Sequence, residues 1–429
     1  MRLVDDRERR ARLAVRHGLH PDHRASDPVT AAEAVVCLHA TEAATVHLAV
    51  GARTTGIAPV DVERSLYEDR SLVKQLAMRR TLFAFPATCC RRRWGSRSLG
   101  SHRSNGGSSP VTPHGTASPR TATPRLDAAG GAVVSRLTGS APLSARALRE
   151  ELPELSGAIT VNEDKRYGGT FNLAPRVLTR LGAEGRITRG ANAGHWRLSK
   201  PAWALLPDWL GEIVTPLALD EAYAQLVRRW LSQFGPGTLE DVQWWLGATK
   251  GATRAALAAV GAVEVALERD RTGWVLPDDL DPVADVSPWA ALLPTLDPTT
   301  MGWKHREAYL DPAHRELLFD SFGNGGSTAR WDGRIVGASG PGRRRRRLRG
   351  RVPRHRPRWR REVRPRPRGA ATDRLARRGA DHQCLQLAAD EGRATPLSRR
   401  SADGSRRPAA VAGGCHPRPA HWVDERANP

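Results

Sequence analysis

The sequence of 429 residues has few cysteines, methionines and aromatic residues, and it lacks any long apolar run. Its five cysteines have no spacing typical of a zinc site, and the adjacent Cys89 and Cys90 cannot easily serve as two ligands of one ion. We therefore expect reduced thiols, no metal and no cofactor. No stretch approaches the ~20 apolar residues of a membrane span, and residues 1–6 lack the apolar core of a signal peptide. These absences predict a cytoplasmic protein without a membrane segment.

The net charge of +22 is concentrated in two segments. Residues 341–429 contain 25 Arg and 8 acidic residues, and residues 91–126 contain 7 Arg and no acidic residue, so the rest of the chain carries a net charge of about −2. A strong positive excess usually indicates a polyanionic partner. Because the remainder is nearly neutral, a DNA-facing surface there has to be local.

Both basic segments also lack Ile, Phe, Tyr and Lys. Such sequence cannot bury enough apolar area to offset the entropy of ordering it, which predicts disorder. Two explanations stay open. The segments are genuine basic regions that bind phosphates without sequence preference, or they arise from frameshifted translation of a GC-rich gene. The second is favoured because a hairpin pattern at 328–337, with Asp332-Gly333 as its turn, starts a β-rich unit that does not continue beyond Gly340.

The stretch from Pro142 to Ser199 has the pattern of one winged-helix unit. Ser144 is placed to cap a first helix, and apolar residues recur at helical spacing over 173–181. Two short β-type runs within 187–198 flank a turn rich in Gly and Asn. Helix, helix, hairpin is the order of elements in a winged helix.

The same order recurs in two other places. Thr238 stands where Ser144 stood, and the pattern then runs to Leu276; a weaker copy begins at the capping box of Thr30 and Glu33. In that copy we expect helices over 30–41, 44–53, 59–67 and 72–78 and a strand over 81–85. The sequence therefore predicts an α+β fold, mainly α with small β, made of three tandem winged-helix modules and an incomplete C-terminal β-rich domain.

The expected domain boundaries follow from these patterns. They are 1–88 for winged helix 1, 89–131 for a disordered or frameshifted segment, 132–200 for winged helix 2, 201–285 for winged helix 3, 286–340 for the start of the β-rich domain, and 341–429 for the Arg/Pro-rich tail.

The second module carries candidate DNA-binding residues. Its second helix is the expected recognition helix, which in helix-turn-helix proteins lies in the major groove, and Arg suits both phosphates and guanine edges. The candidates are Arg176, Thr179 and Arg180 on the polar face of this helix, Lys165 and Arg166 before it, and Arg189, Asn192 and His195 in the wing. A solvated helix face is the alternative. We expect Trp196 and Trp274 to be core residues under the wings, and Asp297 to cap a turn.

Several strings resemble the AlkZ/YcaQ-like family of winged helix DNA-binding domain-containing proteins, which includes crosslink-repair DNA glycosylases. The strings are His39–Thr45, Ala77–Phe83, Lys165–Gly169, Gly182–Arg186 with Asn192–Trp196, and Leu292–Trp303. The resemblance covers most of 10–88 and 132–338. It implies three winged helices, a β-barrel-like C-terminal domain and excision of alkylated or crosslinked bases.

The resemblance also implies where catalytic residues would lie. In these glycosylases a Gln-hydrophobic-Gln or Gln-hydrophobic-Asp tripeptide at the end of an early helix holds the water that attacks the sugar carbon, and here that place falls on His39-Ala40-Thr41. His39 can accept a hydrogen bond from water and Thr41 can orient it, without a metal. The alternative is that both are cap and packing residues. Arg79 and Arg80 lie in the same module and are expected to meet phosphates.

The leading interpretation is a monomeric DNA-binding protein that engages double-stranded DNA in a concave surface formed by the winged helices. One alternative is an active glycosylase that uses His39 and Thr41. A second is a non-enzymatic regulator that recognises an operator. A third is that the chain, disrupted in two places, does not fold stably.

Overall fold

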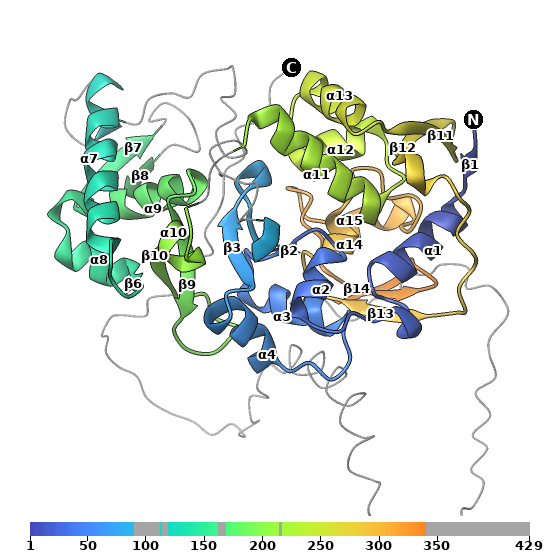
Figure 1. Cartoon of the computed structure of the whole chain (residues 1–429), viewed down its shortest axis with the longest axis horizontal. Coiled ribbons are helices and arrows are strands. Elements are labelled where there is room, and N and C mark those ends of the chain that lie inside the picture. The colour runs from blue at the N-terminus through green and yellow to red at the C-terminus, as the bar shows by residue number, and fades with distance from the viewer. Residues whose placement is uncertain (90–111, 114–118, 162–168, 214–216, 340–429) are drawn as a thin grey trace, which may run out of the picture. The chain divides into compact units, whose positions relative to one another are not determined.

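The structure is a computed structural model that describes residues 1–89, 112–113, 119–161, 169–213 and 217–339 (Figure 1). All of these residues belong to one compact unit, Met1–Pro365. The segment 341–429, most of 91–126, and Lys165 and Arg166 lie outside the described residues. The described part contains helices and several β-sheets, so the predicted α+β class is confirmed.

The α-helices are α1 (Asp6–Arg16), α2 (Pro28–Glu33), α3 (Ala43–Gly51), α4 (Pro59–Glu63), α7 (Pro119–Leu137), α8 (Ala145–Glu151), α9 (Leu173–Ala183), α10 (Leu206–Leu210), α11 (Leu219–Phe234), α12 (Leu239–Leu246), α13 (Lys250–Ala259), α14 (Pro298–Met301) and α15 (Arg315–Leu318). The short turns are η1 (Pro21–His23), η2 (Arg64–Glu68), η3 (Met78–Arg80), η4 (Pro153–Leu155), η5 (Pro277–Asp279) and η6 (Pro312–His314).

The strands are β1 (Leu3–Val4), β2 (Leu38–His39), β3 (Leu72–Leu76), β4 (Leu82–Pro86), β5 (Thr112–Pro113), β6 (Leu143–Ser144), β7 (Ala158–Val161), β8 (Gly169–Asn172), β9 (Ile187–Asn192), β10 (Pro201–Leu205), β11 (Val263–Leu267), β12 (Arg271–Val275), β13 (Ala290–Leu293), β14 (Ser327–Trp331) and β15 (Arg334–Ser339).

A six-stranded sheet carries several of the predicted site residues, including His39, Arg189 and Asn192. Its order is β2-β4-β3-β9-β10-β6, so it joins strands from the first and second predicted modules. β3 and β4 form an antiparallel hairpin, β2 pairs with the other side of β4, and β9 meets β3 where Lys74 is opposite Arg189. Because side chains alternate along a strand, this register decides which of them share a face.

Two elements of the first module differ from the sequence prediction. The expected helix over 72–78 is strand β3, because it is paired on both sides, with β4 and with β9. The expected helix over 30–41 is instead Pro28–Glu33, with Asp27 as its N-cap and not the predicted Thr30, and Leu38 and His39 form strand β2 at the sheet edge. A short run of apolar residues does not separate helix from strand by itself, so partners elsewhere in the chain decided both cases.

Helix, helix and antiparallel strand pair follow one another in the two downstream stretches. They are α8, α9, β9 and β10 in the first stretch, and α12, α13, β11 and β12 in the second. Ser144 caps α8 through Ala147 N, and Thr238 caps α12 in a reciprocal box with Asp241, as the sequence predicts. In the first stretch the second strand begins at Pro201 rather than near residue 195.

The loop between β9 and β10 explains this shift. Asn192 donates its Nδ2 to the Leu198 carbonyl at 2.8 Å, and its Oδ1 accepts from Lys200 N at 2.7 Å. Trp196, expected in the core, is instead half-buried, with ring centroids 5.0 Å from His47 and 5.3 Å from His195. Trp274 is also half-buried but packs against the main core.

The last described sheet has the order β13-β14-β15, and Asp332 and Gly333 take positive φ in the turn between β14 and β15, as expected for the predicted hairpin. Helix α7 begins at Pro119, inside the segment for which the composition predicts disorder, and Ala129, Val133 and Leu137, which are fully buried, lie in its later part.

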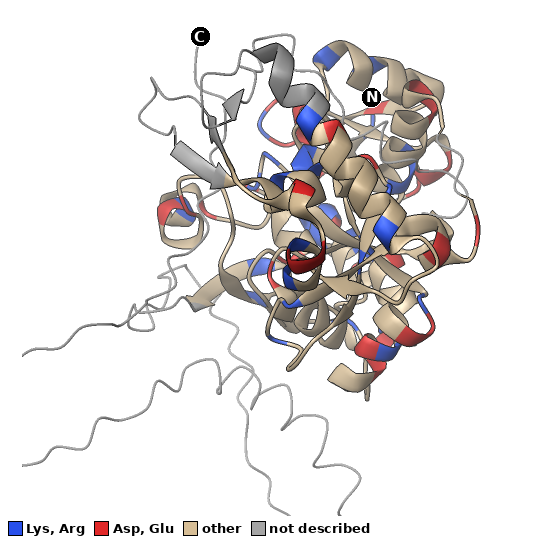
Figure 2. Cartoon of the chain, turned by 90° about the vertical axis from the view of Figure 1, so that its left-hand side faces the viewer, with Lys and Arg blue, Asp and Glu red and all other residues tan. Residues whose placement is uncertain are grey.

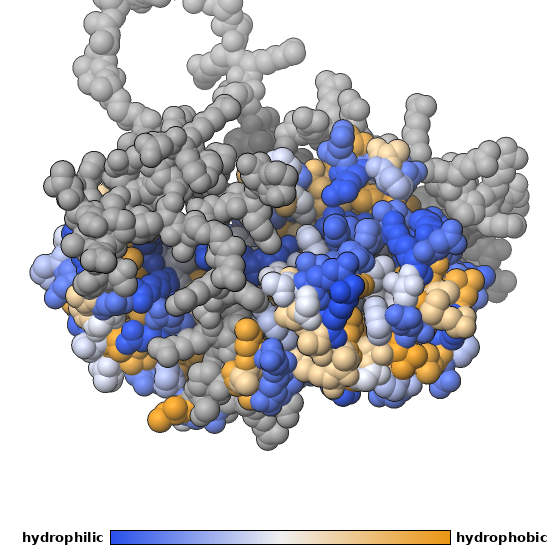
Figure 3. Space-filling view, turned by 90° about the horizontal axis from the view of Figure 1, so that it is seen from above, coloured by the Kyte–Doolittle hydropathy of each residue, from blue (hydrophilic) through white to orange (hydrophobic). Residues whose placement is uncertain are grey.

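The main core runs through residues 13–89 and 204–338, and a second core fills the segment 126–205. On the face shown in Figure 3, hydrophilic residues cover much of the described surface, and apolar residues form several separate groups between them. Within the described ranges, no helix combines the length and the apolar character that crossing a membrane requires.

A buried ion pair fixes α3 relative to the C-terminal part of the main core. Arg53, just after α3, donates both terminal nitrogens to Asp297 at 2.8 Å, and both side chains are fully buried. Asp297 also caps α14 by accepting from Thr299 N, so the predicted capping role is confirmed. A second link joins Thr45 Oγ1 to the Thr295 carbonyl at 3.0 Å. Since α3 follows β2 directly, these contacts also restrain the strand that carries His39.

Candidate functional site

His39 lies in the edge strand β2 and is only 7% exposed. It is directly opposite Phe83 of β4, and the two rings meet edge to face with centroids 5.3 Å apart. Burial and the nearby charge of Arg79 lower the pKa of His39 to about 3. Its Nδ1 is enclosed and has no hydrogen-bond partner among the described residues. The imidazole is therefore neutral at physiological pH and has an unused ring nitrogen, which is uncommon for a buried polar group.

Thr41 lies two residues further on, in the bend before α3, and is exposed. The structure therefore places the two predicted catalytic residues differently, since His39 is enclosed by the sheet and Thr41 faces solvent. The sequence expectation that both end a helix does not hold. A neutral imidazole can still accept a hydrogen bond from water, and an exposed hydroxyl next to the strand end can donate to the same water or to a bound ligand.

The predicted pair Arg79 and Arg80 forms the tip of the β3–β4 hairpin, and both residues have positive φ. The Arg79 guanidinium stacks on Trp244 of α12 at 4.2 Å, whereas Arg80 is exposed. Arg306 approaches the same indole ring at 5.2 Å. Two cations thus border Trp244 beside the strand end that carries His39, and Arg80 extends the positive charge toward solvent.

The predicted recognition helix is α9. Arg176 is exposed on it and Thr179 is half-buried. Arg180 forms ion pairs with Asp127 at 2.6 Å and with Glu184 at 2.8 Å. Because its charge is already neutralised, Arg180 is a weak candidate for a phosphate contact, whereas Arg176 stays a candidate because it is exposed.

The predicted wing residues have different environments. Asn192 uses its side chain to close the loop before β10, and exposed His195 accepts a hydrogen bond from Arg197 N at 3.2 Å. Arg189 is half-buried, and its guanidinium lies 5.5 Å from the Trp203 ring. Of these three side chains, Arg189 has the most donor groups left for a ligand within the described ranges.

The sequence analysis missed Lys74, which is the cross-strand neighbour of Arg189. Its ammonium donates to the Tyr67 hydroxyl at 2.6 Å and lies 5.0 Å from the same ring. Burial and the charge of Arg189 lower the pKa of Lys74 to about 8. The available signal was a lysine at the centre of the otherwise apolar run Leu72–Leu76, but it could not show which residue lay opposite.

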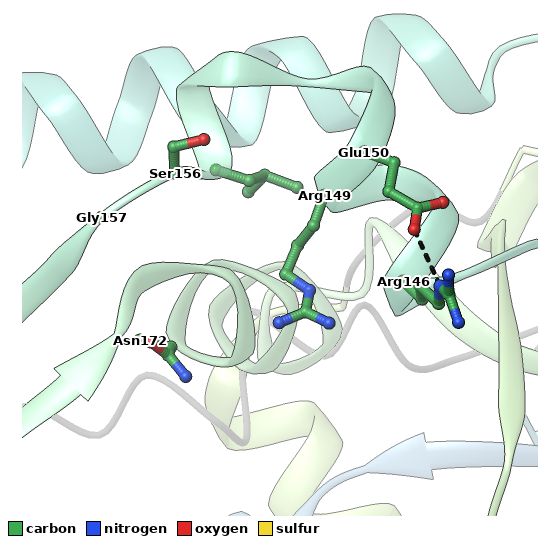
Figure 4. A pocket seen from close by; sticks show the side chains of 7 residues that line it. Arg146, Arg149, Glu150, Ser156, Gly157 and Asn172 are labelled. Carbon is green, nitrogen blue, oxygen red and sulfur yellow. Dashed lines mark hydrogen bonds and ion pairs between the residues drawn. The ribbon is translucent and has the colours of Figure 1, made fainter.

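A pocket of about 490 Å³ is lined by residues of α8, η4 and the start of α9 (Figure 4). Arg146 is paired with Glu150 at 2.7 Å, and Arg149 stands apart from this pair. No predicted site residue lines the pocket. Among the residues that the structure describes, no group of three or more His, Cys, Asp or Glu could hold a metal ion.

Charge of both signs is interspersed over the described ribbon (Figure 2), in agreement with the nearly neutral balance outside the two basic segments. The positive sites described above are therefore local. They are formed by the hairpin tip with Trp244, by Lys74 with Arg189, and by the exposed face of α9.

Comparison with known proteins shows that this α+β fold is that of a DNA-glycosylase-like protein. The model of the DNA glycosylase AlkZ-like family matches residues 32–381. The match spans most of the chain, and the protein belongs to this family, which confirms the resemblance found in the sequence.

A similar solved structure is the Streptomyces sahachiroi DNA glycosylase AlkZ. Its TM-score is 0.60 at 22% sequence identity, and the alignment covers 79% of this chain and 88% of that chain. At this identity the likeness shows a shared fold. The search of curated proteins found no significant match.

Proposed function

We propose that this protein binds double-stranded DNA and hydrolyses the N-glycosidic bond of an alkylated or crosslinked base, with His39 positioning the attacking water. The observation that carries the proposal is the buried, neutral imidazole of His39, which lies beside Arg79 and whose Nδ1 has no hydrogen-bond partner in the part of the chain that the structure describes. Membership of the AlkZ-like family supplies the reaction class.

The low pKa of His39 limits what the residue can do. An imidazole whose pKa is about 3 is a weak base, so it orients the water by accepting a hydrogen bond and does not remove its proton before attack. Water then forms the bond to C1′ as the bond from C1′ to the base nitrogen breaks, and the water proton passes to solvent. Alkylation makes the base a better leaving group, so weak assistance is enough. The Thr41 hydroxyl orients the same water through a second hydrogen bond.

The winged-helix assignment is part of the proposal. The order of α8, α9, β9 and β10 supports a module over 132–200, and the order of α12, α13, β11 and β12 supports one over 201–285. Support for the module over 1–88 is weaker because β2 and β3 replace parts of two expected helices. We assign Arg80 and Arg176 to phosphate contacts because both are exposed and lie on the hairpin tip and on α9. The protein acts as a monomer.

The experiment is a base-release assay on methylated duplex DNA with purified full-length protein. We expect His39→Ala to lower the single-turnover rate about 100-fold, while His39→Gln, whose amide can also hold a water, stays within about tenfold of the wild type. His39→Phe keeps the contact with Phe83 and should be inactive but folded. His23→Ala is the matched control, because His23 is exposed on η1. Unchanged release by His39→Ala would remove the proposed role.

A second pair of variants tests Thr41. The double change His39→Gln with Thr41→Gln restores the tripeptide of the family's glycosylases, and we expect release at or above the wild-type rate. If the wild type releases no base from any alkylated or crosslinked duplex and instead selects one operator sequence over random duplex by a factor of 1,000 or more, the regulator is the correct function.

A further inference from the structure

Lys74 and Arg189 are two half-buried cations that face each other without a carboxylate between them. They are Cα partners across β3 and β9, and in the described ranges neither forms an ion pair. Like charges directly opposite in a sheet repel each other, and burial removes the water that would screen them. Burial also lowers the pKa of Arg189. An arrangement of this kind is costly to the free protein, and an anion placed between the two side chains would relieve it.

The other titratable groups around Lys74 do not supply that anion. The pKa of Tyr67 on η2 is raised by burial and by Glu63, so its hydroxyl is neutral. His47 on α3 is neutral, because burial and Lys74 lower its pKa to about 4. Exposed His195 faces His47 from the β9–β10 loop. The remaining group is Glu63 on α4, whose charge acts on Lys74 only at a distance, without an ion pair.

We propose that Lys74 and Arg189, with the Tyr67 hydroxyl, bind one backbone phosphate of the DNA. This inference rests on the proposed function only in its choice of ligand. Guanidinium and ammonium groups form short, charge-assisted hydrogen bonds to phosphate oxygens, and the hydroxyl can donate a third. Trp196 borders the site through its contact with His47, and Arg197 lies 5.0 Å from the Trp196 ring, so a further cation and an aromatic surface extend it along a strand.

The sheet register separates this site from the reaction centre. Leu38, Ala84 and Lys74 occupy one row across β2, β4 and β3, whereas His39, Phe83 and Gln75 occupy the next row. Because successive side chains point to opposite faces, Lys74 and His39 lie on different faces of the sheet. A sugar carbon held at His39 is out of reach of the Lys74 amine. The role of Lys74 is therefore to bind a phosphate away from the reacting sugar, and not to attack that sugar as a nucleophile.

The test is binding of the full-length protein to an undamaged 20-base-pair duplex, measured by fluorescence anisotropy from pH 6.5 to 9 at several salt concentrations. Lys74 must be charged to bind, and its pKa in the free protein is about 8. We therefore expect affinity to fall as pH rises through 8, with uptake of about half a proton per complex at pH 8. Calorimetry in two buffers of different ionisation enthalpy measures that uptake.

Variants separate this site from the rest of the surface. Lys74→Met should weaken binding about tenfold, lower the salt slope by about 1 and abolish the pH dependence. Lys74→Arg should keep the affinity but lose the pH dependence, which also shows that the variant is folded. Lys304→Met is the matched control, because Lys304 is exposed in another part of the chain.

Three results would overturn the proposal. They are wild-type affinity and salt slope in Lys74→Met, affinity of the wild type that does not change with pH, and covalent trapping of Lys74 on abasic DNA by borohydride, which would make it a nucleophile. Because the duplex is undamaged, the test is independent of base release. His39→Ala should keep the full pH profile, so a failure of the proposed glycosylase activity and a failure of the phosphate site give different results.

Discussion

Arg53 is a buried cation and Lys74 a half-buried one, but they differ in their partners among the described residues. Arg53 pairs with a carboxylate, whereas Lys74 donates to a neutral hydroxyl. Arg53 donates two hydrogen bonds to Asp297 and one to Thr299 Oγ1 at 2.7 Å, and all three side chains are buried. Lys74 faces Arg189 instead, and within the described ranges its hydrogen-bond acceptor is the neutral Tyr67 hydroxyl. Burial of an unpaired charge costs much more than burial of a paired one.

The difference indicates what each region is for. The Arg53 pair joins α3 to α14, and Asp297 neutralises the buried charge of Arg53, so the role of the pair is to hold the strand that carries His39. Among the described residues the Lys74 pair forms no ion pair, and Glu63 acts on Lys74 only from a distance, so the cost of the pair is explained by a ligand that is absent from the free protein. His39 belongs with the second group, because it too is buried with unused bonding capacity.

The largest loss of stability should come from breaking the ion pair between Arg53 and Asp297. Asp297→Ala leaves Arg53 buried without its partner, and we expect it to lower the free energy of unfolding by about 3–5 kcal/mol. Urea denaturation followed by circular dichroism measures this. Asp311→Ala is the matched control, because Asp311 is an exposed cap of η6 and should cost about 1 kcal/mol. Equal losses in the two variants would contradict the structural role of the pair.

Acid should destabilise the protein through His39. Its pKa is about 3 in the folded protein and near 6.5 in the unfolded chain, so the unfolded state takes up the proton first. Stability from this residue is therefore complete above pH 6.5 and is lost as pH falls toward 3, by at most about 1.4 kcal/mol per pH unit.

The variant His39→Phe removes this pH-dependent contribution to stability. Between pH 7.5 and 4.5 the wild type should lose about 2–3 kcal/mol more than the variant. Urea melts of both proteins at the two pH values give the difference, to which His17 and His47 contribute equally in both. Parallel losses in the two proteins would mean that His39 is not buried in its neutral form.

Asp241 is a buried acid that hydrogen bonds stabilise, and it forms no ion pair with any other described residue. Its carboxylate accepts from Thr238 N at 3.0 Å, Thr238 Oγ1 at 2.9 Å and His305 N at 2.7 Å. Asp241→Ala leaves these donors unpaired and should cost about 1–3 kcal/mol, less than Asp297→Ala because no buried charge remains. If Asp241→Ala loses as much stability in thermal or urea denaturation as Asp297→Ala, the unpaired charge of Arg53 does not explain the cost of Asp297→Ala.

The smallest expected change in stability is an increase. Lys74→Met removes one of two like charges in a sheet, so we expect stability to rise by up to about 1 kcal/mol while DNA affinity falls. If Lys74→Met instead loses as much stability as Asp241→Ala, Lys74 has a structural role like that of Arg53.

Local signals in the sequence were enough for much of the fold. The capping residues Ser144 and Thr238, the helices that follow them, and the Asp332-Gly333 turn depend on neighbours within a few positions, and all are present in the structure. Strand β3 was missed because its pairing with β4 and β9 is a tertiary property. Asn192, expected to contact DNA, closes a loop, and only the position of Pro201 could have indicated that.

The candidate site shows the same limit. The family tripeptide located His39, but its burial against Phe83 depends on how β2 pairs with β4, which no local pattern reveals. Lys74 and Arg189 are separated by more than 100 residues in the sequence and meet only through sheet register. Residue type therefore predicted part of the chemistry, and the register determined which residues act together.

The most direct test of the central claim is the pH dependence of the single-turnover rate of base release. If His39 positions water as a neutral imidazole, the rates of the wild type and of His39→Gln should both stay flat between pH 5 and 7.5, because the pKa of His39 is about 3. A wild-type rate that falls below an apparent pKa near 6.5, together with a flat profile in His39→Gln, would show an exposed, titrating histidine and contradict the account.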